Sequence, residues 1–359
     1  MLKMSCQKLS RQYLHLVMSE GRGLYSLRHL DVSKLFYPST PEALDAEAQA
    51  KTKKKNGINK IGSITGLPRP SMYFQPSQRV ESCPLSSIGA IALFGENKNK
   101  ILLSDNTGHT CIYNTDPQSL IVTPNLKSPK ATDCVAVSNL GAATRAMSDD
   151  HTNLFLMDMH PGSCCFEVLT YDSTGKLCWG ALPPPPFFKD WEYKVPLMPD
   201  FTVVDNSRIC VSTTTATYSF DTVTHEWNKV GDWVLPFRAE YIPELRLWLG
   251  LLPDSGPYDL CTLDNLSTTP GSPPPTMQHI GEEESELPEN WSQLVHDLVN
   301  LGSGKFCIAN NFILNFGEVR RSWIPVTVFT GVEVLPVEGG IRMLKHKSKS
   351  FRTEFEVVL

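Results

Sequence analysis

The stretch Ala216-Thr-Tyr-Ser-Phe-Asp-Thr-Val-Thr-His-Glu-Trp227 decides the fold. It predicts a strand that ends near Phe220, a turn opened by Asp221, and a second strand that begins at Trp227. Asp and Thr side chains accept backbone N–H bonds in such a turn, and the flanking aromatic residues then lie on one buried face. The stretch therefore predicts an antiparallel strand pair.

Three further stretches repeat this pattern with decreasing clarity. They are Leu169-Thr-Tyr-Asp-Ser-Thr-Gly-Lys-Leu-Cys-Trp179, Ile112-Tyr-Asn-Thr-Asp-Pro117 and Leu263-Asp-Asn-Leu-Ser-Thr268. Aligned on Tyr113, Tyr171, Phe220 and Leu263, the copies are 58, 49 and 43 residues apart. Periods of this size, with several short strands in each, are typical of one four-stranded blade of a β-propeller.

An aromatic residue followed by Asp, x-x-Thr and Trp resembles the blades of kelch proteins. The longer run from Ala216 through Gly231-Asp232-Trp233 and Leu235-Pro236-Phe237 to Leu247-Trp248-Leu249-Gly250 resembles the plant kelch-like proteins, expanded in grasses, that carry a domain of unknown function. Further similar segments are Leu35-Phe36-Tyr37-Pro38, Gly302-Ser-Gly-Lys-Phe-Cys307 and Leu344-Lys-His-Lys-Ser348. The resemblance implies a propeller and assigns no activity.

The number of blades stays open at this point. The only Gly-Gly pair, a usual mark of kelch repeats, is Gly339-Gly340. We expect one all-β propeller over residues 1–359, with kelch-like four-stranded blades, six in number, and seven as the alternative. Phe351 to Leu359 alternate apolar and polar residues, and Leu14, Leu16 and Met18 indicate another strand. We expect these terminal segments to share one blade and so to close the ring.

Two polar segments interrupt the strand pattern, at residues 39–60 and 266–289. The first changes from acidic to basic, and the second joins a Ser/Thr/Pro tract to Glu282-Glu-Glu-Ser-Glu286. Both are predicted to be mobile polar loops within the propeller. Only Ala43 to Lys54 and Trp291 to Leu301 have a pattern compatible with a helix, and a strand fits the second almost as well.

Composition excludes several classes of protein. The net charge of −5 argues against nucleic-acid binding. The longest apolar run, Ile88 to Phe94, is far shorter than the ~18 residues of a membrane span. Ten scattered cysteines without C-x-x-C spacing, and no signal-peptide core, favour reduced thiols in an intracellular protein, cytoplasmic or nuclear and not secreted.

No stretch carries a convincing catalytic, metal or cofactor motif, and we expect no catalytic residue, no cofactor and no metal. Asp149-Asp150-His151 and His160 are interpreted as loop and turn residues, and Lys51, Lys53, Lys54 and Lys55 as a solvated linker. Other candidates are given structural roles. We interpret Lys345, Lys347 and Lys349 as the solvent-exposed face of a strand and Pro183 to Pro186 as a stiff connection between strands. The core is expected to include four tryptophans, Trp179, Trp227, Trp233 and Trp248.

A propeller displays loops on two faces, an arrangement suited to binding. The leading expectation is a non-catalytic protein-interaction module that is a monomer and binds a protein partner, neither nucleic acid nor membrane. The ligand-binding residues stay unknown. The alternatives are a carbohydrate-binding propeller and a glycosidase-like or oxidase-like enzyme. Exposed aromatic residues would mark a lectin, and a pair of carboxylates in a pocket would mark a glycosidase.

Overall fold

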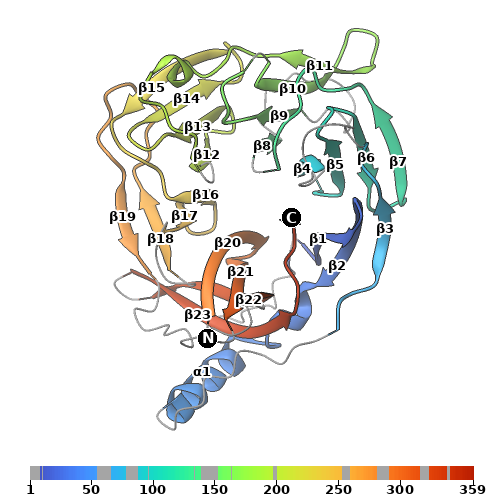
Figure 1. Cartoon of the computed structure of the whole chain (residues 1–359). Coiled ribbons are helices and arrows are strands. Elements are labelled where there is room, and N and C mark those ends of the chain that lie inside the picture. The colour runs from blue at the N-terminus through green and yellow to red at the C-terminus, as the bar shows by residue number, and fades with distance from the viewer. Residues whose placement is uncertain are drawn as a thin grey trace.

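The computed structural model describes residues 9, 11–54, 66–77, 88–95, 97–132, 134–138, 153–162, 164–196, 200–252, 259–280, 291–315, 323–337 and 340–359. These residues form six four-stranded antiparallel sheets arranged as blades around a central axis (Figure 1). The fold is a six-bladed β-propeller, which confirms the expected class and selects six blades over seven.

The strands of each blade follow one another in sequence, except in the blade that contains both ends of the chain. That blade, blade I, comprises β1 (Tyr13–Gly21), β2 (Leu24–Asp31), β3 (Pro70–Phe74) and β24 (Val357–Val358). Blades II and III comprise β4 (Ile88–Phe94), β5 (Lys100–Asp105), β6 (Thr110–Asn114), β7 (Ser119–Thr123), β8 (Val135–Ser138), β9 (Leu154–Met157), β10 (Phe166–Tyr171) and β11 (Leu177–Ala181).

Blades IV to VI continue this order around the ring. They comprise β12 (Asp200–Val204), β13 (Arg208–Ser212), β14 (Thr217–Asp221), β15 (Glu226–Gly231), β16 (Phe237–Ile242), β17 (Leu247–Leu251), β18 (Leu260–Asp264), β19 (Thr276–His279), β20 (Trp291–Gly302), β21 (Lys305–Asn315), β22 (Trp323–Val337) and β23 (Gly340–Phe351). In the described part of the chain, three helices lie outside the sheets: η1 (Val32–Leu35), α1 (Thr40–Lys54) and η2 (Pro186–Lys189).

The sequence repeat corresponds to one strand position in four consecutive blades. Its alignment residues all lie on the third strand of their blades, β6, β10, β14 and β18: Tyr113, Tyr171, Phe220 and Leu263. The following turn is held as predicted, because Asp221 Oδ1 accepts the N–H groups of Val223 (2.9 Å) and Thr224 (3.1 Å). Asp172 Oδ1 does the same for Thr174 (2.8 Å).

Tryptophans on the outer strands of blades III and IV connect each of these two blades to the one before it. The indole N–H of Trp179 on β11 donates to the carbonyl of Pro124, just after β7 of blade II, over 2.9 Å. Trp227 on β15 donates to the carbonyl of Pro183, just after β11 of blade III, also over 2.9 Å. Each indole therefore packs between blades and also satisfies a neighbouring carbonyl group.

The two ends of the chain pair within blade I, as expected. Val357 and Val358 lie opposite Val17 and Leu16 of β1, and His15 and Leu359 exchange two backbone hydrogen bonds of 2.9 Å. The closing strand is shorter than predicted, because Phe351 ends β23 and Phe355 packs in the core between the last blade and the first. The ring is closed by β24, near the axis (Figure 1).

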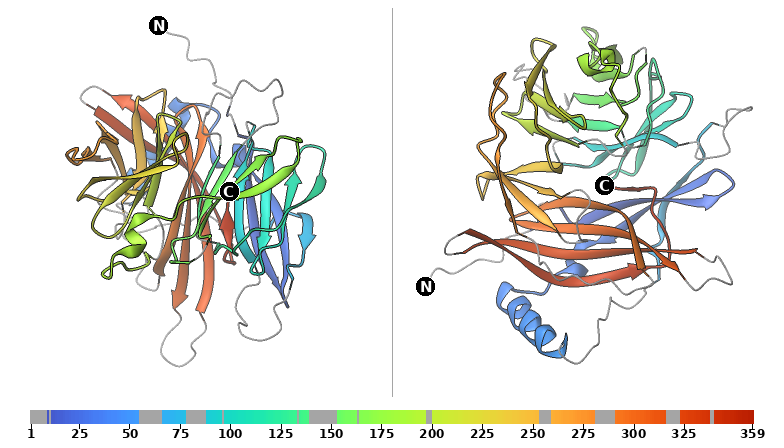
Figure 2. Two further views of the ribbon diagram at one scale, coloured as in Figure 1. Left: turned by 90° about the horizontal axis from the view of Figure 1, so that it is seen from above. Right: turned by 60° about the vertical axis from the view of Figure 1, so that its left-hand side comes forward.

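Residues 39–60 differ from the expected loop over much of their length. Thr40 to Lys54 form helix α1, which lies against β23 on the outside of blade VI (Figure 2). Thr40 Oγ1 donates to Glu333 Oε2 on β22 (3.1 Å), and Glu47 forms an ion pair with Arg342. These polar contacts hold the helix in place, although it has few large apolar residues on one face. Residues 55–60 lie outside the described residues.

The expected loop at 266–289 also contains ordered structure. Its residues Thr276 to His279 form β19, the outer strand of blade V, and Leu266 is buried. The Ser272 carbonyl accepts the indole N–H of Trp233 over 3.1 Å. The Ser/Thr/Pro composition concealed this strand, and residues 281–289 lie outside the described residues. Trp291 to Leu301, for which the pattern allowed a helix or a strand, belong to strand β20.

Strand direction divides the loops between two faces of the propeller. The upper face is formed by the links between successive blades and by the turns that join the second and third strands within each blade. The lower face carries the turns that follow first and third strands. Within the described part of the chain, no helix combines the length and the apolar character needed to cross a bilayer.

Candidate functional site

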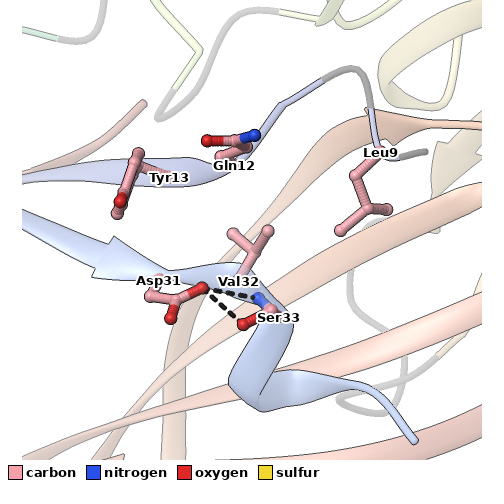
Figure 3. Close-up of a pocket in the computed structure, with 6 residues that line it drawn as sticks. All are labelled: Leu9, Gln12, Tyr13, Asp31, Val32 and Ser33. Carbon is pink, nitrogen blue, oxygen red and sulfur yellow. Dashed lines mark hydrogen bonds between the residues drawn. The ribbon is translucent and has the colours of Figure 1, made fainter. Parts of the chain in front are cut away.

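Two cavities on the molecule are candidates for a binding site. The smaller, of about 350 Å³, lies at the lower face near the start of β1 (Figure 3). Its one carboxylate, Asp31 Oδ1, accepts the N–H (3.0 Å) and the hydroxyl (2.6 Å) of Ser33. Asp31 is therefore occupied in capping η1, and this cavity offers little for a ligand.

The larger cavity, of about 510 Å³, lies at the upper face between blades III and IV. It is formed by the link that follows β11 and by the turn between β13 and β14, and we call it the upper pocket. Its lining residues are Phe187, Asp190, Trp191, Glu192, Tyr193, Lys194, Thr213, Thr214, Thr215 and Tyr218.

The floor of the upper pocket is aromatic and fixed in place. The Phe187 ring is buried and lies 5.2 Å from the Tyr193 ring and 5.1 Å from the Tyr218 ring, measured between centroids. The Tyr193 hydroxyl donates to the Met159 carbonyl of blade III over 2.7 Å. Burial raises the pKa of Tyr193 above its ordinary value, so the phenol remains a neutral donor.

A tight turn carries Trp191, the solvent-exposed aromatic side chain of the upper pocket. The Tyr193 N–H donates to the Asp190 carbonyl over 3.1 Å, which places Trp191 and Glu192 at the tip of the turn. Asp190 Oδ1 also accepts the Glu192 N–H (3.0 Å). Trp191 is 89% exposed although its backbone is held on both sides.

The opposite wall is a turn with free hydroxyl groups. Thr213 Oγ1 accepts the N–H of Thr215 (3.3 Å) and of Ala216 (3.1 Å), so its side chain stabilises the turn. Thr214 and Thr215 are exposed beside it. Chemically, the upper pocket offers an aromatic face, hydroxyl groups, two carboxylates at Asp190 and Glu192, and the ammonium of Lys194.

The sequence analysis did not single out Trp191. It lies in the link after Pro183 to Pro186, outside the blade repeat, and that position is the signal by which it could have been found. The four tryptophans that the sequence favoured as core residues do pack inside: Trp179 is buried, and Trp227, Trp233 and Trp248 are half-buried in apolar clusters.

The remaining sequence candidates are not brought together. Asp149-Asp150-His151 lies outside the described residues, and His160 contacts Asp158 Oδ1 (2.9 Å) in an exposed turn. Lys51, Lys53 and Lys54 end α1, and Lys55 lies outside the described residues. Lys345, Lys347 and Lys349 lie half-buried on β23, where the Lys347 ammonium is 4.6 Å from the Tyr37 ring centroid.

A Ser, His and Asp group at the upper face of blade II superficially resembles a catalytic triad. Ser77 Oγ (3.2 Å) and Asp105 Oδ2 (3.1 Å) both contact the same atom, Nδ1 of His109. A triad needs the nucleophile and the carboxylate on different ring nitrogens, so this group cannot relay a proton between them. Hydrogen bonds from Thr107 and Ser77 hold the pKa of Asp105 near 2 despite its burial.

The described residues contain neither a metal-ligand cluster nor a disulfide. No group of three or more His, Cys, Asp or Glu side chains suited to a metal occurs among the described residues. The eight cysteines that the structure describes are free thiols. Burial raises the pKa of Cys210 and of Cys261 to about 12, so both are protonated and unreactive.

Comparisons with known proteins extend this description. No curated protein matches the chain. Solved structures that resemble it include the Cps50 (Swd1) β-propeller domain of Myceliophteria thermophila (8% identity, TM-score 0.39, 93% of each chain covered) and Hsv2 of Kluyveromyces lactis (10%, 0.31, 73% of this chain and 98% of that one). The N-terminal domain of Nup159 matches at 10% identity and a TM-score of 0.34 over 73% of this chain, which spans 62% of that domain.

Similarity to the known families gives a more specific result. One family matches residues 11–351, from just before β1 to the end of β23, and it is described as a protein of unknown function, DUF1668. The match includes strands of all six blades and leaves out only β24. The chain therefore belongs to the DUF1668 family.

Proposed function

We propose that this propeller is a non-catalytic protein-interaction module and that its upper pocket is the docking site. The observation that carries the proposal is Trp191, 89% exposed on a turn that hydrogen bonds hold rigid. Exposed tryptophans carry a large share of interface energy, and a rigid anchor loses little conformational entropy on binding.

The chemistry of the pocket rim suggests the kind of partner. Asp190 and Glu192 oppose Lys194 and the neighbouring Lys189, so the rim has no net charge. An uncharged rim around an aromatic anchor favours a protein segment that inserts an apolar side chain between Trp191 and Tyr218. The buried thiols support the expected cytoplasmic or nuclear location, where such thiols stay reduced.

A carbohydrate-binding propeller is the second candidate, and the same pocket supports it. An exposed indole stacks on the apolar face of a sugar, and hydroxyl and carboxylate groups such as those of Thr214 and Glu192 bind sugar hydroxyls. The glycosidase-like alternative would use Asp190 and Glu192 as its carboxylate pair, and both are exposed to water. Catalytic acids are usually partly buried, which makes this the weakest candidate.

The test compares Trp191→Ala with Tyr73→Ala, because Tyr73 is also an exposed aromatic residue (58%) but lies on β3, away from the upper pocket. Partners captured by cross-linking to the wild-type protein are identified and then titrated against both variants. We expect Trp191→Ala to weaken binding at least tenfold and Tyr73→Ala to leave it unchanged.

A glycan array with the same proteins separates the candidates. Saturable binding of one glycan class that Trp191→Ala abolishes, with no partner that depends on Trp191, would replace the interaction module by a lectin. A partner that binds Trp191→Ala as tightly as wild type would exclude the upper pocket as its docking site.

A further inference from the structure

A proline tract of the chain itself lies beside the upper pocket and contacts a tryptophan. Pro183 to Pro186 belong to the link that follows β11, which also forms one wall of the pocket. Pro185 has φ −56° and ψ 136°, close to the polyproline II conformation. The Pro183 carbonyl accepts the indole N–H of Trp227 over 2.9 Å. The fold therefore already contains an indole that donates to a carbonyl of an extended proline tract.

The floor of the upper pocket continues the aromatic cluster of this contact. The Phe187 ring follows the proline tract directly and lies 6.2 Å from the Trp227 ring and 5.1 Å from the Tyr218 ring, measured between centroids. Trp191 follows four residues later and is 89% exposed, so its ring and its indole N–H are both accessible. The pocket, with a volume of about 510 Å³, thus offers a second tryptophan with the chemistry that Trp227 uses within the chain.

Several fixed polar groups of the pocket are already engaged within the protein. The Tyr193 hydroxyl donates to a backbone carbonyl over 2.7 Å, and Asp190 Oδ1 accepts a backbone N–H over 3.0 Å. The accessible donors beside the aromatic floor are the Trp191 indole N–H and the hydroxyl groups of Thr214 and Thr215. Donors next to aromatic faces suit a ligand that combines apolar rings with unpaired carbonyl groups.

The backbone around the pocket limits the conformation of a bound segment. None of the described lining residues lies on an outer strand, so they provide no sheet edge to which a β-strand could be added. A bound helix would keep its carbonyl groups in its own hydrogen bonds and leave the donors of the pocket unpaired. A polyproline II segment has no internal hydrogen bonds, so its carbonyls can accept these donors while its rings pack on the aromatic side chains.

We propose that the upper pocket binds a proline-rich segment of a partner protein in the polyproline II conformation. A proline ring packs between Trp191 and Tyr218, and the Trp191 indole N–H donates to a carbonyl of the segment, as the Trp227 indole does within the chain. The balanced charges of the rim favour a segment without net charge. The inference rests on the proposed function, because it specifies the partner chemistry of the same pocket.

The test is fluorescence anisotropy of a labelled ten-residue oligoproline titrated with the full-length protein, with a Gly/Ser peptide of the same length as the control ligand. We expect saturable binding of the oligoproline alone. Trp191→Ala should weaken it at least tenfold. Trp191→Phe keeps a ring but loses the N–H, so it should weaken binding about fivefold. Tyr73→Ala is the matched control and should leave binding unchanged, and all three variants should fold, because both side chains are exposed.

The outcomes separate this inference from the proposed function. Absence of saturable oligoproline binding up to about 1 mM would overturn the inference, and so would equal binding to Trp191→Ala or equal binding of the Gly/Ser peptide. A captured protein partner that depends on Trp191 although oligoproline does not bind would overturn the inference and leave the interaction module standing. A glycan that binds through Trp191, with neither oligoproline nor a protein partner, would overturn both.

Discussion

Replacing Lys130 by Met should cost this propeller a large part of its stability. The ammonium of Lys130 and the carboxylate of Glu167 are both fully buried, with Nζ 2.6 Å from Oε1. Lys130 uses its other two donors on the carbonyls of Ser128 (2.5 Å) and Cys164 (2.9 Å). Glu167 also accepts the backbone N–H groups of Lys127 (3.0 Å) and Ser128 (3.2 Å), so the pair fastens the link between blades II and III.

The expected loss follows from the partners that Lys130→Met leaves behind. One buried carboxylate loses its cation, a change that costs about 3–5 kcal/mol, and two carbonyls lose a donor. We expect the free energy of unfolding to fall by about 4 kcal/mol. Glu167→Gln keeps the volume and one acceptor oxygen, so its loss should be smaller, about 2 kcal/mol.

Equilibrium denaturation with urea measures these differences, provided that the slope is the same in all variants. Lys127→Met is the matched control, because the Lys127 side chain is exposed and only its backbone N–H contacts Glu167. Its stability should stay within about 0.5 kcal/mol of wild type. A loss below about 1 kcal/mol in Lys130→Met would refute the reasoning.

Three further predictions concern the ring and its channel side. Trp179→Phe and Trp227→Phe should each cost about 1 kcal/mol by removing the indole hydrogen bonds to the carbonyls of Pro124 and Pro183. Their effects should add, since they lie at different blade contacts; thermal unfolding of the single and double variants checks this. Deleting Val357 to Leu359 should lower the melting temperature sharply, because the two backbone hydrogen bonds between His15 and Leu359 and the pairing of β24 with β1 are lost, and unchanged melting would contradict closure by β24. Burial raises the pKa of the Asp200 carboxyl from 3.8 to about 6, so the folded state binds the carboxyl proton more tightly than the unfolded state does. The stability of the wild-type protein therefore falls as the pH rises from about 4 to about 6. Asp200→Asn should therefore be more stable than wild type near neutral pH, by at most about 3 kcal/mol, and no more stable below about pH 4, as unfolding at both pH values would show.

The repeat around Phe220 was enough to predict the blades, because a strand, an Asx turn and an outer tryptophan are all local features. The same locality explains what was missed. The strand Thr276 to His279 is short and follows a Ser/Thr/Pro tract, so only its pairing with β18 identifies it. The pattern over Ala43 to Lys54 was compatible with a helix, but the packing of α1 on blade VI was not foreseen, because its partners Glu333 and Arg342 lie almost 300 residues away in sequence.

The sites were less predictable than the fold. Trp191 is one of seven tryptophans, and its place outside the blade repeat is the one local feature that separates it from the buried Trp179. The upper pocket combines the link after β11 with the turn between β13 and β14, so it exists only because blades III and IV lie side by side. A single sequence reveals local turns, but it does not reveal which side chains from different blades meet.

Helix α1 has a consequence for the solubility of the propeller. Every blade ends in an outer strand whose backbone groups can pair with another chain, and long apolar edges of this kind promote aggregation. In blade VI that strand, β23, has 12 residues, and α1 lies against it (Figure 2). Lys345, Lys347 and Lys349 add charge along the same strand. The helix and these lysines together protect the edge from intermolecular β-pairing, so removing α1 would expose a template for aggregation.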